Sequence, residues 1–175
     1  MAQEKLTVDE IRTQLTRRRL PRWNELPDIG LYMDQVLSLM DSYLEKCLVP
    51  GGCGVTASMV NNYVKQGAMP APVKKKYGRE HIARLIVICV LKSALPIASI
   101  GRLINADLSQ FSQQEAYDIF CDQFEHAGRN AASAAEAVRN SEQRHVKKMV
   151  IICSILRAQA EQALAQSVLE LPQEE

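Results

Sequence analysis

Residues 55–82 read VTASMVNNYVKQGAMPAPVKKKYGREHI, and this stretch predicts the fold of the chain. Thr56 is suited to begin a helix, because its hydroxyl can accept a hydrogen bond from a free amide of the first turn. Gly67 is suited to end that helix, because it adopts a left-handed conformation without steric cost. We therefore expect a helix of about three turns between them. The residues expected to pack inward are Val60, Tyr63 and Val64, and those expected on the other side are Ser58, Asn61, Asn62 and Lys65.

The residues after this helix predict a short connection and then a central helix. Pro70 and Pro72 force an extended segment, since proline lacks an amide donor and restricts the residue before it. Three lysines follow at 74–76, and the segment 70–77 is long enough only for a tiny hairpin. A helix is then expected over residues 79–94, where LIVICVL is apolar on every side. A helix apolar all round must lie at the centre of a core.

This stretch resembles the MerR type of winged helix-turn-helix over about 50 of the 175 residues. The matching residues are Val55, Thr56, Val60, Tyr63, Gly67, Met69, Pro70, Tyr77, Glu80, Leu85, Ile88, Leu91 and Ile100. The chain differs from that pattern at Asn61 and Asn62, where an arginine and an aromatic are usual, and in its shorter wing, residues 70–77. The whole chain also resembles a family of bacterial proteins described only as a domain of unknown function. The MerR resemblance implies DNA binding in transcriptional regulation by a protein that acts as a dimer.

Charge is distributed unevenly along the chain, although the net charge is only +1. Residues 55–102 carry eight basic and one acidic side chain, whereas residues 1–54 carry seven and eight, and residues 103–175 carry six and eleven. The three segments thus have net charges of −1, +7 and −5 in chain order. A basic block on a helix-turn-helix pattern is typical of a protein that binds a polyanion. A solvated lysine-rich face is the alternative interpretation of the charge by itself.

The resemblance and the charge together give a set of candidate DNA contacts. An Asn amide can bond N6 and N7 of adenine, whereas basic side chains suit phosphates. The predicted base contacts are Ser58, Asn61 and Asn62, and the predicted backbone contacts are Thr56, Tyr63, Lys65, Lys74, Lys75, Lys76, Tyr77 and Arg79. Two polar residues on an exposed helix face remain the alternative interpretation of Asn61 and Asn62.

The flanking segments are expected to add helices at both ends. Thr7 and Glu10 have capping-box spacing, which predicts a helix over about 8–18 that ends in three arginines suited to its dipole or to phosphates. Residues 21–27 are expected to be extended, with Trp23 as a packing anchor. The first helix of the helix-turn-helix is expected from Asp28 or Asp34 to about Leu48. The inward residues expected along the chain are Val36, Leu37, Met40 and Leu44, then Ile100, Leu103 and Ile104 in a helix over 97–104.

The C-terminal third is rich in alanine and predicts long helices. Ser112 and Glu115 form a second capping box, and Gly128 is expected to end the helix that they begin. Its expected buried stripe is Ala116, Ile119, Phe120 and Phe124. A further helix to about Leu169, with an interruption near residues 140–141, is expected to present an apolar face of Val146, Met149, Val150, Cys153, Leu156 and Ala160. We expect this face to form a homodimer.

The predicted fold class is therefore mainly α, with a winged helix-turn-helix domain at residues 1–106 and a C-terminal helical domain at 107–175. The five cysteines are odd in number and form no CxxC pair, which argues against disulfides. Cys89 and Cys153 are expected in the core, whereas Cys47 and Cys53 keep a metal or redox role open as an alternative. Metal or acid–base roles for Asp122 with His126, or for Cys121 with Glu125, are the less favoured interpretations of residues that share a helix face.

No nucleotide-binding loop or nucleophile elbow occurs in the sequence, so we expect no enzymatic activity, no cofactor and no metal. No apolar run of 18 residues is present, and the N-terminus lacks the apolar region of a signal peptide. A cytoplasmic protein without a membrane span is therefore expected. Its expected partners are double-stranded DNA and a second copy of itself, and the effector is unknown. The alternative function is a helical protein-interaction module that has lost DNA binding, which the short wing and the two asparagines favour.

Overall fold

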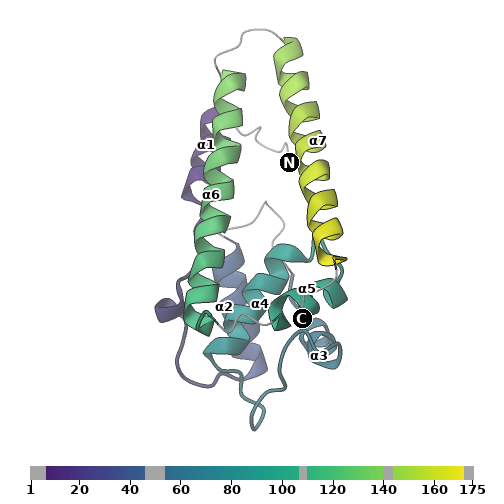
Figure 1. Cartoon of the computed structure of the whole chain (residues 1–175). Helices are drawn as coiled ribbons and strands as arrows, with labels where there is room; N and C mark the ends of the chain where they lie inside the picture. Colours follow the sequence, from purple (N-terminus) through teal and green to yellow (C-terminus); the bar gives the residue numbers. More distant parts are fainter. Residues whose placement is uncertain (1–6, 46–53, 107–109, 140–143, 172–175) are drawn as a thin grey trace. The chain divides into compact units, whose positions relative to one another are not determined.

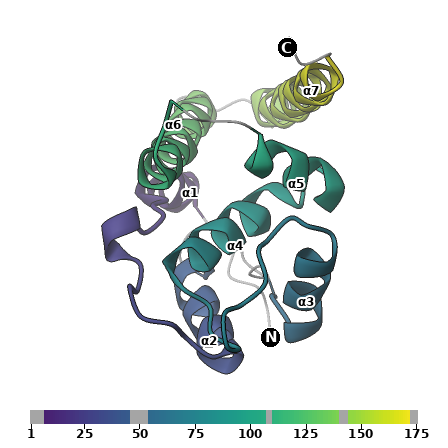
Figure 2. The same ribbon diagram turned by 60° about the horizontal axis from the view of Figure 1, so that its bottom comes forward.

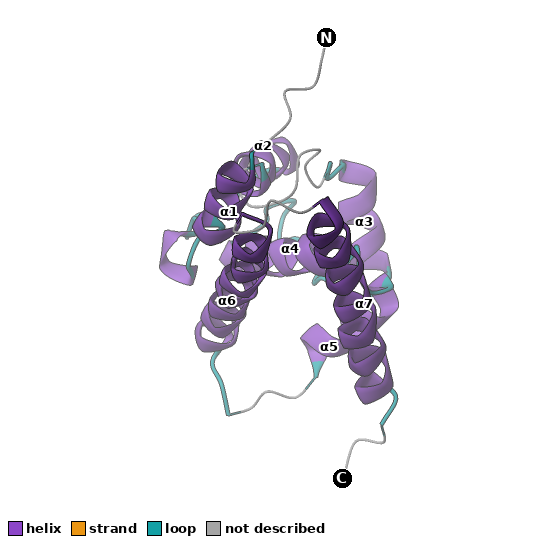
Figure 3. Cartoon of the chain, turned by 90° about the horizontal axis from the view of Figure 1, so that it is seen from above, coloured by secondary structure: helices purple, strands orange, loops and turns teal. Residues whose placement is uncertain are grey.

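The computed structural model describes residues 7–45, 54–106, 110–139 and 144–171 (Figure 1). Its helices are α1 (Val8–Arg17), the 3-10 turn η1 (Trp23–Glu25), α2 (Met33–Leu44), α3 (Ala57–Lys65), α4 (Arg79–Leu91), α5 (Ile97–Asn105), α6 (Gln113–Arg139) and α7 (Arg144–Leu169). Within these residues the only β pairing is two isolated antiparallel bridges, so the described chain appears as helices and loops alone (Figure 3). The prediction of a mainly α fold is confirmed.

The chain divides into two compact units, Arg19–Asp122 and Met1–Arg18 with Gln123–Glu175. The boundary between them falls inside α6, so the first turns of that helix belong to the Arg19–Asp122 unit. The predicted division into domains at residues 1–106 and 107–175 stays a prediction. None of the helices in the described residues combines the length and apolarity needed to span a bilayer.

Helix α4 forms the centre of the Arg19–Asp122 unit, as its apolar sequence predicts. It packs against α2 and α5, and α2 packs in turn against α3 (Figure 2). The α4 residues that are buried are Ile82, Ala83, Leu85, Ile86, Ile88 and Cys89. Val36, Met40 and Leu44 of α2 and Ile100 of α5 are also buried in this core. A strongly apolar helix is stable only when neighbours cover most of its surface, and here six residues of α4 are buried while Arg84 and Val87 are half-buried.

The segment before α2 differs from the extended chain that the sequence predicts. Trp23–Glu25 form one 3-10 turn, and the backbone amide of Arg22 donates to the Glu25 carboxylate at 2.7 Å. Helix α2 begins after Tyr32, and the backbone amide of Tyr32 donates to the Gln35 side chain at 2.9 Å. The predicted N-caps Asp28 and Asp34 are therefore wrong. An amide acceptor three residues into the helix can satisfy the N-cap amide, so an acidic N-cap is not required there.

The first turns of α6 are fixed to this segment by polar contacts. The Tyr117 hydroxyl donates to the Pro21 carbonyl at 2.9 Å, and the Trp23 amide donates to the Asp118 carboxylate at 2.9 Å. Arg22 lies 2.8 Å from the Asp122 carboxylate. Burial raises the pKa of the Tyr117 hydroxyl, so this group stays protonated and keeps its role as a donor. These contacts hold the first turns of α6 in place within the Arg19–Asp122 unit.

The buried face of α6 differs from the predicted stripe. Tyr117 and Cys121 are buried, whereas Ile119, which was expected inside, is 44% exposed. The predicted capping box of Ser112 and Glu115 is confirmed, because the Glu115 amide donates to the Ser112 hydroxyl at 3.2 Å. The start of the helix is therefore predicted correctly, whereas its buried side is shifted by about one residue from the predicted stripe. The residues that pack against this side lie far away in sequence, so local spacing does not identify it.

Gly128 was predicted to end α6, and this prediction is wrong, because Gly128 lies in the interior of the helix. A Cβ atom at this position would lie 2.6 Å from the backbone oxygen of Leu15 in α1. The glycine thus permits a close approach of the two helices, which Arg18 also supports by lying 4.7 Å from the centre of the Phe124 ring. The predicted capping box of α1 is confirmed, with the Glu10 amide donating to Thr7 at 3.2 Å.

Helix α7 is exposed along the described part of its surface. Met149 is 53% exposed and Leu156 is 57% exposed, and the other large apolar side chains exposed on it are Ile151, Ile152, Ile155, Leu164 and Val168. Cys153, which was expected in a core, is exposed as well. The interruption predicted near residues 140–141 lies outside the described residues.

Candidate nucleic-acid interface

Helix α3 begins and ends at the residues that its sequence predicts. The hydroxyl of Thr56 accepts a hydrogen bond from the Met59 amide at 3.3 Å, so Thr56 is the N-cap. At the other end, Gly67 has φ of +72°. Its amide donates to Val64, and the amide of Ala68 donates to the carbonyl of Tyr63 at 3.0 Å. This pair of bonds is the Schellman motif, which satisfies the last carbonyls of a helix and stops it sharply.

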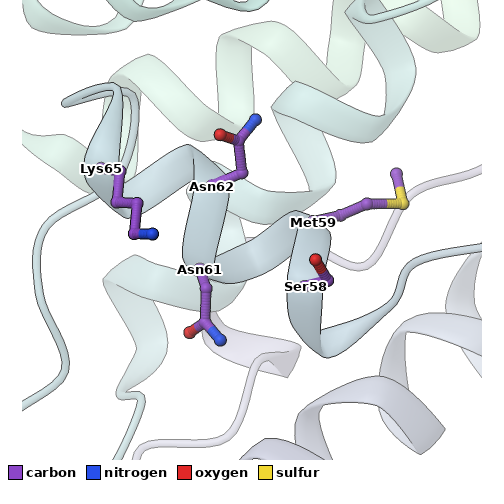
Figure 4. Close-up of a pocket in the computed structure, with 5 residues that line it drawn as sticks. All are labelled: Ser58, Met59, Asn61, Asn62 and Lys65. Carbon is purple, nitrogen blue, oxygen red and sulfur yellow. The ribbon is translucent and has the colours of Figure 1, made fainter.

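The two faces of α3 differ in polarity. Val60 and Tyr63 are buried at 0% and 3% exposure and attach the helix to the core. The opposite face carries exposed polar side chains at positions 58, 61, 62 and 65. A hollow of about 570 Å³ on α3 is lined by Ser58, Met59, Asn61, Asn62 and Lys65 (Figure 4). All three predicted base contacts therefore lie together on one solvent-facing surface.

A two-residue hairpin lies between α3 and α4. The amide of Val73 donates to the Lys76 carbonyl at 3.1 Å, and the Lys76 amide donates back to Val73 at 2.9 Å. The two residues between them, Lys74 and Lys75, have φ of +51° and +63°. Positive φ at both central positions is the geometry of a type I′ turn, which normally carries Asn-Gly. Lysine has a Cβ and no side-chain bond to compensate, so the hairpin tip is strained.

The next residue, Tyr77, anchors the hairpin to the core. Its amide donates to the Leu31 carbonyl at 2.8 Å, and the Leu31 amide donates to the Tyr77 carbonyl at 2.9 Å, which forms the second isolated bridge. The side chain of Tyr77 is 4% exposed, and its ring meets His81 edge-on with centroids 5.5 Å apart. Burial raises the pKa of the Tyr77 hydroxyl. The lysine tip is therefore held by a rigid base.

The charges around the hairpin are largely uncompensated. Lys76 lies 5.4 Å from the centre of the Tyr32 ring, and no described carboxylate pairs with Lys65, Lys74 or Lys75. Arg79 at the start of α4 donates to the Leu26 carbonyl at 3.2 Å. Its other contact is the Asp28 carboxylate at 4.0 Å, so Arg79 also has a structural role.

The predicted contact residues thus fall into two groups. The exposed ones are Ser58, Asn61, Asn62, Lys65, Lys74, Lys75 and Lys76. Thr56 is also exposed, and its hydroxyl is used to cap α3. Tyr63 and Tyr77 are buried and support the surface from behind, and Arg79 is half-buried. The sequence reasoning missed Met59, which lines the hollow, and Tyr32, which is 52% exposed beside Lys76. The alternation of small polar and apolar residues in α3 could have indicated Met59, whereas the pairing of Tyr32 with the hairpin is a tertiary contact.

Other sites considered in the sequence have ordinary contacts. Among the described residues, no group of three His, Cys, Asp or Glu side chains is placed to hold a metal ion. Asp122 pairs with Arg22 at 2.8 Å, and the His126 ring lies 3.3 Å from Asn130. Cys47 and Cys53 lie outside the described residues, so the alternative metal or redox role stays a prediction, as does the absence of enzymatic activity.

Comparison with known families matches residues 21–124 to the family described as a domain of unknown function, DUF1836. The chain belongs to the DUF1836 family. No curated protein and no solved structure matches the chain. The DUF1836 segment nearly coincides with the Arg19–Asp122 unit, so it includes α3, the hairpin, α4 and the first turns of α6. The predicted resemblance to an uncharacterised family is confirmed.

Proposed function

We propose that the DUF1836 segment of this chain is a DNA-binding domain of the winged helix-turn-helix type and that the protein regulates transcription. In this proposal α2 and α3 form the helix-turn-helix, and the hairpin at Val73–Lys76 is a minimal wing. The observation that carries the proposal is the polar face of α3, on a helix anchored by its other side. This face combines two adjacent asparagine amides with Lys65, which no described carboxylate pairs.

The two parts of the surface have different roles in this proposal. The amides of Asn61 and Asn62 read base edges in the major groove, because an Asn amide can donate and accept together at adenine. The ammonium groups of Lys74 and Lys75 bind phosphates, which are the same at every base pair. The strained turn supports this role, because strained backbone conformations occur often at functional sites, where the position of the side chain matters more than the conformational cost.

Fluorescence anisotropy on selected and random duplexes at several salt concentrations tests the proposal. Asn61→Ala or Asn62→Ala is expected to cost roughly 1–3 kcal/mol on the selected site and little on random DNA. Gln114→Ala, on the exposed first turn of α6, is the control and should leave both affinities unchanged. Absence of duplex binding below about 100 μM at low salt, or absence of salt dependence, contradicts the proposal.

We further propose that the protein acts as a homodimer through α7. Exposed apolar residues such as Met149 and Leu156 support this, because a contiguous apolar surface of this kind is rarely left in water. In a two-fold dimer, two copies of α3 can read two half-sites. Light scattering of the full-length Met149→Glu and Leu156→Glu double variant should give a monomer. Gln162→Glu, on the side of the same helix away from Met149 and Leu156, should remain dimeric. A wild-type monomer at micromolar concentration refutes this part.

The alternative function is a helical protein-interaction module without DNA binding. The short hairpin favours it, because only two residues separate Val73 from Lys76 and leave little backbone to enter a groove. Salt dependence separates the two functions: duplex binding falls steeply with salt when phosphates are contacted. A module that uses apolar contacts retains its partner as salt rises.

A further inference from the structure

A second cavity in the Arg19–Asp122 unit has no role in the proposed DNA interface. It has a volume of about 190 Å³ and lies between α4, α5, η1 and the first turns of α6. Its apolar walls are Trp23, Val87, Leu103, Ile104, Tyr117 and Phe120. Helix α3 and the hairpin contribute none of the described lining residues. The site is therefore a separate feature of the fold.

The size and access of the cavity suit a small molecule. An apolar protein cavity of about 150 Å³ stays dry and can bind benzene. The present cavity is somewhat larger, so one ring with a substituent or two small fused rings fit within it. Leu103, in its wall, is 42% exposed, so the cavity is open to solvent. A ligand can thus enter without unfolding of the unit.

The aromatic walls are held in fixed positions. The rings of Trp23 and Tyr117 meet edge to face, with centroids 6.1 Å apart and planes at 60°. The Tyr117 hydroxyl is already bonded to the Pro21 carbonyl, and the Trp23 amide is bonded to Asp118. These bonds fix the Tyr117 ring by its hydroxyl and the Trp23 residue by its backbone, so both rings line the cavity from anchored positions. Such walls favour a ring-shaped ligand, since aromatic rings pack well in edge and offset arrangements.

The polar edge of the cavity carries no free charge. Arg84 lies 3.2 Å from the Glu80 carboxylate and donates to the Asn105 side-chain oxygen at 2.8 Å. The charges of Arg84 and Glu80 therefore compensate one another, and a charged ligand would have to be desolvated without a partner. The amide of Gln113, which is exposed at the rim, can bond one polar group of a neutral ligand.

We propose that this cavity binds a neutral aromatic small molecule of one or two rings. The ligand would bridge α4, α5 and the first turns of α6, and its binding stabilises the arrangement of these helices. The proposal does not depend on the proposed DNA binding, because none of the candidate DNA contacts lines the cavity.

The single tryptophan of the chain gives a direct test, because Trp23 lies in the cavity wall. Iodobenzene is a neutral probe of suitable size that quenches tryptophan fluorescence by the heavy-atom effect. Full-length protein titrated with iodobenzene should show saturable quenching of the tryptophan fluorescence. Toluene, which has no heavy atom, should displace iodobenzene and restore the fluorescence. Benzoate, which has a similar ring and a negative charge, should compete at least ten-fold less well.

Two variants and a matched control locate the binding. Val87→Phe and Ala116→Leu fill the cavity from different helices, and each should weaken iodobenzene binding at least ten-fold while circular dichroism remains helical. Val90→Phe makes the same change on α4 outside the cavity and should bind as wild type. Quenching that does not saturate, that survives both filling variants, or that benzoate blocks as well as toluene overturns the proposal. Acrylamide quenching of Trp23 at low and high protein concentration gives a further check. If Trp23 becomes shielded only at high protein concentration, a second copy of the chain fills the cavity, and the proposal is overturned.

Discussion

The strained hairpin tip allows a substitution that should raise stability and lower DNA affinity together. Lys74 and Lys75 have φ of +51° and +63° in a turn that prefers Asn-Gly. Each left-handed non-glycine residue costs about 1–2 kcal/mol. The double variant Lys74→Asn with Lys75→Gly relieves most of this cost. Glycine returns about 0.5–1 kcal/mol through the greater entropy of the unfolded chain.

The expected net effect is a gain of about 1 kcal/mol in the free energy of unfolding, which corresponds to an increase of roughly 2–4 °C in the melting temperature of a chain of this size. The same variant removes two charges that no described carboxylate compensates. If each lysine contacts one phosphate, the slope of log affinity against log salt should flatten by about 1.8, at about 0.9 per contact. Affinity for selected and random DNA should fall alike, because phosphates carry no sequence information.

Thermal melting and fluorescence anisotropy of the same preparations give both measurements. Lys74→Arg with Lys75→Arg keeps the charges and the strain, and should match wild type in both assays. Lys147→Gln with Lys148→Gln removes two charges from α7 and should leave the salt slope unchanged. A stabilised Asn-Gly variant that binds DNA as wild type refutes the assignment of the hairpin to backbone contact. An Asn-Gly variant that is less stable than wild type refutes the assignment of residues 73–76 to a type I′ turn.

Two further predictions concern stability. Gly128→Ala should destabilise the protein by roughly 1–3 kcal/mol in urea unfolding, because the new Cβ would lie 2.6 Å from the Leu15 backbone oxygen and must force α1 and α6 apart. Ser133→Ala, at an exposed position of the same helix, is the control and should change the free energy of unfolding little. Equal effects of the two substitutions contradict this packing. The pKa of the Glu115 carboxyl is lowered from its ordinary value of 4.5 by the Ser112 amide and hydroxyl, and that of Glu25 is lowered by Arg19 and the Arg22 amide. The stability that these two carboxylates contribute is therefore present above pH 4.5 and is lost as the pH falls through their lower folded-state pKa values. Melting temperatures measured between pH 2 and 7 should therefore fall less toward acid pH for Glu115→Gln than for wild type. An equal fall in melting temperature contradicts the prediction.

Local interactions are the part of this fold that could be predicted from the sequence. Thr56 caps α3 through a bond three residues away, and Gly67 ends it through bonds to the preceding turn. The capping box of Ser112 is equally local. Such bonds depend on residues close in sequence, so the residue types and their spacing suffice to place them. The central position of α4 also followed from the sequence, because a helix apolar on all sides has no stable position in water.

The inward side of α6 and the role of Gly128 depended on the tertiary structure. Tyr117 is buried because its hydroxyl reaches the Pro21 carbonyl, 96 residues away in sequence. Gly128 reads as a helix terminator by its residue type, but its environment is the Leu15 backbone of another helix. Neither partner can be identified from the spacing of nearby residues.

The candidate site divides in the same way. The polar face of α3 was predictable, since the helical period separates Asn61 and Asn62 from Val60 and Tyr63. The left-handed lysines were not, because the propensity of lysine disfavours that conformation, and a hairpin held by Tyr77 and Leu31 imposes it. Sequence determines structure where the bonds are short in chain length. Tertiary structure decides the rest, because burial and strain depend on which distant segment supplies the other half of the contact.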